Sequence, residues 1–110
     1  MPGETDWPYI LSLYDDLLAL KPSPVVGLNR AVALAMVEGP AAGIRAVEEI
    51  RGDPTLAGYY PLAVTLGELH ARAGDPEQSA ACFREALEME SPEPVRRRIQ
   101  ERLRGLELVR

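Results

Sequence analysis

The sequence has few of the residues that build disulfides, strands or membrane spans. Its 110 residues include one cysteine, Cys82, so no disulfide can form within the chain, which favours a reducing, cytoplasmic setting. Aromatic residues make up only 5% of the chain and no stretch alternates cleanly between apolar and polar residues, so strands are not expected. The longest nearly apolar run, Ala31 to Val37, is far too short to cross a bilayer. The polar, acidic start lacks the pattern of a signal peptide.

Basic residues are also scarce over most of the chain. The formal net charge is −5, and residues 1–90 hold six Lys/Arg against fourteen Asp/Glu, a net of −8. Only residues 91–110, with six Arg and three Glu, are basic. Because a protein that neutralises many phosphates needs a broad basic face, we do not expect this chain to bind DNA or RNA directly.

Signals for catalysis or for a cofactor are missing as well. The sequence contains no phosphate loop, no nucleophile elbow and no ligand spacing typical of a metal site. His70, the single histidine, and Cys82 are therefore interpreted as packing residues. The adjacent carboxylates Asp15–Asp16 would point about 100° apart on a helix, so they do not form a catalytic pair. We expect a protein that is not an enzyme and that uses no cofactor or metal.

What the sequence does contain is helical periodicity. Proline and glycine divide it into six segments, and each repeats its apolar residues with the period of a helix. The expected helices cover approximately residues 5–20, 24–38, 40–51, 59–73, 76–90 and 91 onward. The first is predicted to bury one stripe, made of Trp7, Ile10, Leu11, Tyr14, Leu17 and Leu18. The last has a single narrow stripe, typical of a terminal cap, at Val95, Ile99, Leu103 and Leu106.

One pair of these helices matches a known repeat. Residues 60–92 carry Leu66–Gly67, a Gly74–Asp75 turn and Phe83 at positions typical of the tetratricopeptide repeat, whose unit is about 34 residues. Gly67 and Ser79 lack bulk, so the two helices can approach closely while Phe83 fills the space beside them. The preceding unit fits more loosely. The predicted fold is all-α, a tetratricopeptide-like right-handed stack of antiparallel helix pairs with about six helices, and residues 1–110 are read as a single domain of this kind.

Several short runs resemble one family more specifically. The strongest are the segments 22–26 (Pro-Ser-Pro-Val-Val) and 28–33 (Leu-Asn-Arg-Ala-Val-Ala), supported by 5–8 (Thr-Asp-Trp-Pro) and 56–59 (Leu-Ala-Gly-Tyr). Together they resemble the C-terminal extension of certain bacterial extracytoplasmic-function sigma factors. The resemblance implies a regulatory role in transcription initiation, exerted through contacts with the sigma factor's core regions or with RNA polymerase. The promoter-melting and helix-turn-helix regions of a sigma factor are not among these 110 residues.

The residues singled out for partner contact are Asn29, Arg30, Glu68, Arg96 and Arg97. For Asn29 and Arg30 the alternative is internal: Asn29 would satisfy a loop backbone group, and Arg30 would pair with Asp15 or Asp16. The arginine cluster of residues 96–104 has a similar alternative, as a solvated face pairing with Glu93, Glu101 and neighbouring acidic helices. For the whole chain the alternative function is a free-standing repeat adaptor that binds peptides or helices. A further expectation is that two copies could pair through an uncovered end.

Overall fold

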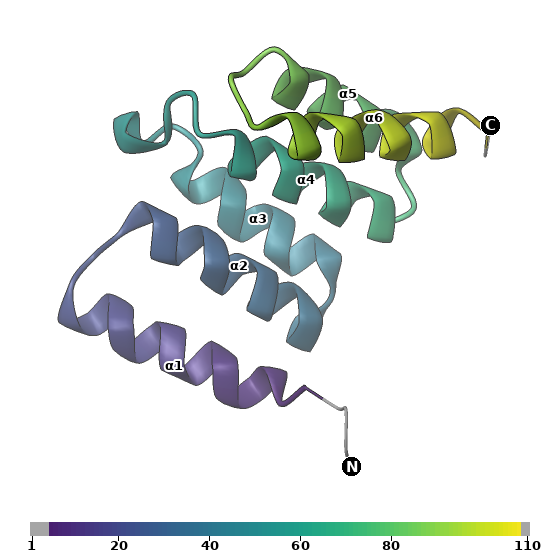
Figure 1. The fold of residues 1–110 in the computed structure, drawn as a ribbon. Coiled ribbons are helices and arrows are strands. Elements are labelled where there is room, and N and C mark those ends of the chain that lie inside the picture. The colour runs from purple at the N-terminus through teal and green to yellow at the C-terminus, as the bar shows by residue number, and fades with distance from the viewer. Residues whose placement is uncertain (1–4, 109–110) are drawn as a thin grey trace. The chain divides into compact units, whose positions relative to one another are not determined.

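The computed structural model describes residues 5–108, and all their regular structure is helical (Figure 1). Six α-helices and one short 3-10 helix follow one another as α1 (Trp7–Leu20), α2 (Pro24–Glu38), α3 (Pro40–Ile50), η1 (Pro54–Leu56), α4 (Tyr60–Arg72), α5 (Pro76–Leu87) and α6 (Glu93–Leu108). No strand occurs within the described range. The predictions of an all-α fold and of six helices are therefore confirmed.

Local sequence explains where most helices begin. Helices α1 to α5 each have a proline in the first two positions, where its missing N–H is not needed by the helix. The side chains of Asp6, Ser23 and Asp75 cap α1, α2 and α5 by accepting hydrogen bonds from backbone N–H groups three residues later. Gly39 alone connects α2 to α3, and its φ of 101° is a conformation that favours glycine.

The structure differs from the predicted secondary structure at the end of the fifth helix and in the connection after the third. The fifth helix ends at Leu87, three residues before the predicted Glu90. In the connection after α3, which the sequence leaves without regular structure, residues 54–56 form the 3-10 helix η1. The first difference lies at a helix end and the second in a connection, and in both places the periodic signal of apolar residues is weak.

Contacts divide the chain into two compact units, residues up to Thr55 and residues from Leu56. In the first unit α2 packs against both α1 and α3, so this mostly apolar helix lies between two neighbours. Leu28 and Ala31 of α2 and Val47 of α3 are buried. The inward side of α1 is only half-buried, and it consists of Trp7, Ile10, Leu11, Tyr14 and Leu18. Leu17, predicted for that stripe, is instead 49% exposed.

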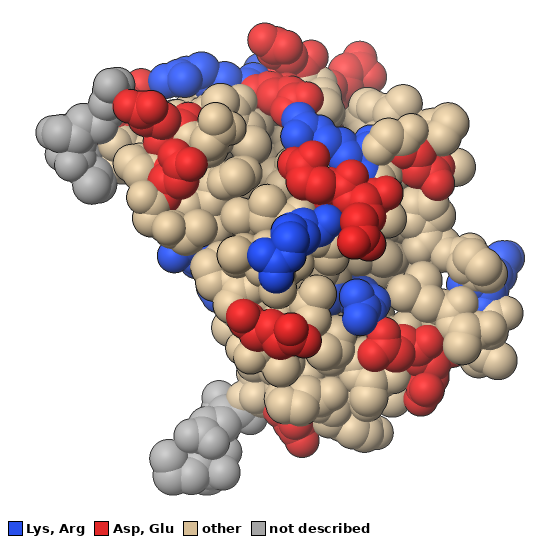
Figure 2. Space-filling view, turned by 180° about the vertical axis from the view of Figure 1, so that it is seen from behind, with Lys and Arg blue, Asp and Glu red and all other residues tan. Residues whose placement is uncertain are grey.

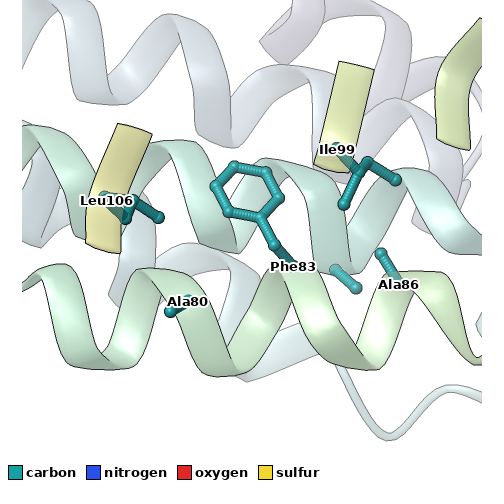
Figure 3. Close-up of a cluster of buried hydrophobic side chains, with 6 residues drawn as sticks. Ala80, Phe83, Ala86, Ile99 and Leu106 are labelled. Carbon is teal, nitrogen blue, oxygen red and sulfur yellow. The ribbon is translucent and has the colours of Figure 1, made fainter. Parts of the chain in front are cut away.

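In the second unit α5 packs against both α4 and α6. A cluster of buried side chains is centred on Phe83, and Figure 3 shows its ring between Leu106 and Ile99 of α6. Ala63 of α4 belongs to the same cluster, and Val95 and Leu103 pack against it. The stripe predicted for the last helix is thus the one that covers the core of this unit. The small residues among the large ones let three helices share one core.

Candidate partner-binding surfaces

The second unit is held together by a close approach of α4 and α5. A Cβ atom added at Gly67 would lie 2.8 Å from the Phe83 ring, which is closer than real side chains come. Ser79 is fully buried, and its hydroxyl donates a hydrogen bond of 2.6 Å to the carbonyl of Gly67. The predicted role of these three residues is confirmed. Their packing fixes the position of the Phe83 ring.

That ring forms part of a groove lined by α4, α5 and α6. The groove has a volume of about 320 Å³, and its apolar lining comes from Val64, Phe83, Val95 and Ile99. Its charged lining comes from Glu68 on α4 and from Arg98 and Arg102 on α6. An apolar floor with a few charged groups at the edge suits one apolar side chain of another polypeptide.

Glu68 and Arg102 form an ion pair at this groove. Arg102 donates two hydrogen bonds to the Glu68 carboxylate, at 2.8 Å and 2.9 Å, and its guanidinium carbon lies 5.8 Å from the centre of the Phe83 ring. Hydrogen bonding to Glu68 raises the pKa of Arg102 above its ordinary value. Both side chains are nearly half exposed, so the pair adds at most about 1 kcal/mol to stability. Glu68, predicted to touch a partner, is thus engaged within its own unit, where it holds Arg102 beside the Phe83 ring.

The structure separates Arg96 from Arg97. The Arg96 guanidinium donates hydrogen bonds to the carbonyls of Leu87, at 3.0 Å, and Met89, at 3.3 Å, at the end of α5. Arg97 is exposed. Arg96 therefore has a structural task within the unit, whereas Arg97 and Arg98 present their charge to solvent. Arg96 and Arg97 were predicted to contact a partner together because they are adjacent in the chain. Adjacent residues on a helix, however, point in different directions.

In the first unit Arg30 and Asn29 behave differently. Arg30 pairs with Asp15 across α2 and α1, with 2.6 Å between Nε and Oδ1, so the interpretation that it pairs with Asp15 or Asp16 is confirmed. Asn29 is exposed, and within residues 5–108 its side chain makes no hydrogen bond, so the internal role considered for it is not supported. Its contact with a partner stays a prediction.

The remaining polar candidates offer no chemical centre. Cys82 is buried, as predicted for a packing residue, and His70 is half-buried. Among the described residues no group of three or more His, Cys, Asp or Glu is placed to hold a metal ion. None of the described helices has the length and apolar character needed to cross a membrane. Acidic and basic side chains are interspersed on the face seen in Figure 2 rather than gathered into one basic patch.

Comparison with known proteins adds one relative. The chain is 40% identical over 86 residues to an uncharacterized protein of Rhizobium meliloti (strain 1021). The match covers 78% of this chain but only 20% of the relative, so the chain spans about a fifth of the length of that protein. No family model matches the sequence. No solved structure matches it either.

Proposed function

We propose that this chain is the regulatory, protein-interacting domain of a bacterial extracytoplasmic-function sigma factor and takes part in the control of transcription initiation. The Pro-Ser-Pro-Val-Val run at 22–26 and the Leu-Asn-Arg-Ala-Val-Ala run at 28–33 support the family, and they lie at the start and in the middle of α2. The domain acts by contact with the sigma factor's core regions or with RNA polymerase.

The observation that carries the protein-interaction part is the groove lined by α4, α5 and α6. Its floor is apolar and its charged residues lie at the edge, an arrangement that suits one apolar side chain of a partner polypeptide. Arg98 at its edge is exposed and has no ion-pair partner among residues 5–108. A partner segment with an apolar anchor next to a carboxylate satisfies both features.

The test uses the full-length protein that carries these residues and a reporter for the promoter it controls. Deleting residues 5–108 should change promoter output, and Arg98→Glu should change it in the same direction. Arg104→Glu is the matched control, because Arg104 is an exposed arginine of the same helix that does not line the groove. Unchanged output after the deletion would contradict the sigma-factor role.

The same measurement separates the alternative function. A free-standing adaptor of another pathway would leave promoter output unaffected by every one of these changes. If the deletion changes promoter output but Arg98→Glu and Arg104→Glu have the same effect, the regulatory role stands and the groove is not the contact surface.

A further inference from the structure

Helix α1 is apolar on two sides, and only one of them is covered. Its inward side packs on α2, while Tyr9, Leu13, Leu17 and Leu20 are 60%, 42%, 49% and 84% exposed. Their spacing of four, four and three residues places them on one stripe along the whole helix. A helix on the surface of a soluble protein normally has one apolar stripe, and a contiguous exposed one marks an interaction site. These four residues are called the outer stripe of α1.

The charges beside the outer stripe along α1 are negative, and one cation, Lys21, follows directly after Leu20 at the C-terminal end of the helix. Residues 6–20 contain Asp6, Asp15 and Asp16 and no lysine or arginine. Asp15 is neutralised by Arg30 of α2. Asp16 is exposed and lies three residues from Leu13 and four from Leu20, so it stands at the edge of the outer stripe. The surface is therefore apolar with an uncompensated carboxylate along one edge.

We propose that the outer stripe of α1 docks an amphipathic helix of a protein partner that carries lysine or arginine beside its own apolar stripe. Two helices bury apolar stripes of this length by ridge-into-groove packing, and a cation beside the partner's stripe would pair with Asp16. A second copy of α1 is a poorer occupant, because it would bring Asp16 against a helix with Asp6, Asp15 and Asp16, whose one cation between residues 6 and 21, Lys21, lies beyond its C-terminal end. This docking does not depend on the sigma-factor role, and the outer stripe and the groove share no residue.

The experiment uses the 110-residue chain and two synthetic peptides of about five helical turns. Both peptides have the same leucine stripe; one is flanked by lysine and the other by glutamate. In a calorimetric titration the lysine peptide should bind at least about tenfold more tightly than the glutamate peptide, a difference of about 1.4 kcal/mol. Its affinity should fall as salt is added, because ions screen the exposed charge of Asp16.

Variants assign that binding to α1. The double substitution Leu13→Ser with Leu17→Ser should lower the affinity for the lysine peptide at least about tenfold. Leu20→Ser alone, at the most exposed position, should also lower this affinity without risk to the fold. Asp16→Lys should reverse the preference between the peptides. Glu49→Lys is the matched control, since Glu49 is an exposed carboxylate on α3, and it should leave the preference unchanged.

Three results would overturn the proposal. The first is equal binding of the two peptides, and the second is equal effects of Asp16→Lys and Glu49→Lys. The third is that the chain alone sediments as a dimer that Leu17→Ser dissociates, which would make a second copy the occupant. In each case the reporter test of the groove is unaffected.

Discussion

At the scale of single residues, the contact between Gly67 and Phe83 sets the distance between α4 and α5. Gly67→Ala would place a Cβ atom 2.8 Å from Phe83 Cζ, so the ring or a helix has to move. We expect a loss of about 1–3 kcal/mol in the free energy of unfolding, measured by urea denaturation. Gly105→Ala is the control, because nothing lies within 4 Å of its added Cβ, and it should stabilise α6 by up to about 1 kcal/mol. Equal effects of the two substitutions would show that the close approach does not govern stability.

A second residue-scale prediction concerns Asp53 in the connection after α3. Its carboxylate accepts hydrogen bonds from the Thr55 hydroxyl at 2.7 Å and from the Thr55 backbone N–H at 2.9 Å, and these lower its pKa below 3.8. Thr55→Val removes the hydroxyl, whose hydrogen bond lowers the pKa of Asp53 more than that of the backbone N–H does. Because the N–H remains, the pKa of Asp53 should rise only part of the way back in an NMR titration. A native-state pKa below the unfolded value means that the stabilisation is present above the unfolded pKa and is lost as the pH falls through the native one. Identical titration curves for the two proteins would disprove the role of the hydroxyl.

At the scale of helices, Arg96 caps the C-terminal end of α5. Its guanidinium donates hydrogen bonds to the carbonyls of Leu87 and Met89, which have no acceptor role within the helix at that end. Arg96→Met should lower the free energy of unfolding by about 1–2 kcal/mol, because charged hydrogen bonds to partly buried carbonyls are lost. Arg97→Met, at an exposed neighbour, should change it by less than about 0.5 kcal/mol. Urea unfolding followed by circular dichroism compares the two, and a larger effect of Arg97→Met would reverse the assignment.

Helix starts could be predicted because their signals are local. Ser23 before Pro24 and Asp75 before Pro76 act as caps whatever the rest of the chain does. The end of α5 could not be placed from local signals, and the side chain that caps it there, Arg96, lies nine residues beyond Leu87. The stripe predicted to be buried on α1 included one residue too many, Leu17, which lies on the exposed side. Because α1 is apolar on two sides, the sequence does not tell which side packs.

The candidate surfaces were less predictable, because they combine distant residues. Glu68 and Arg102 are separated by 34 positions, and only the return of α6 to the core brings them together. Phe83 and Gly67 were found because the tetratricopeptide pattern records a contact of this kind. The outer stripe of α1 was missed, although the spacing of Tyr9, Leu13 and Leu17 is visible in the sequence. A search for a second apolar face on each helix would have found it.

At the scale of the whole molecule, charge decides which class of partner the chain can meet. The net charge is −5 and the isoelectric point is about 4.9. The excess of arginine is confined to residues 91–110, and two of these arginines, Arg96 and Arg102, are already bonded within their unit. The positive charge left for a phosphate backbone is therefore small, whereas Asp16 and the other exposed carboxylates repel it.

We therefore expect the 110-residue chain to bind a short DNA duplex more weakly than about 10 µM, even at low salt where electrostatic attraction is strongest. The measurement is the fluorescence anisotropy of a labelled duplex, with a lysine-rich peptide as the positive control. Removing two exposed arginines by Arg97→Ala and Arg98→Ala should leave the anisotropy unchanged, because too few phosphates are contacted for their loss to register. Salt-sensitive binding that disappears with these two arginines would instead make α6 a nucleic-acid contact, and the control of transcription would then act through DNA as well as through protein.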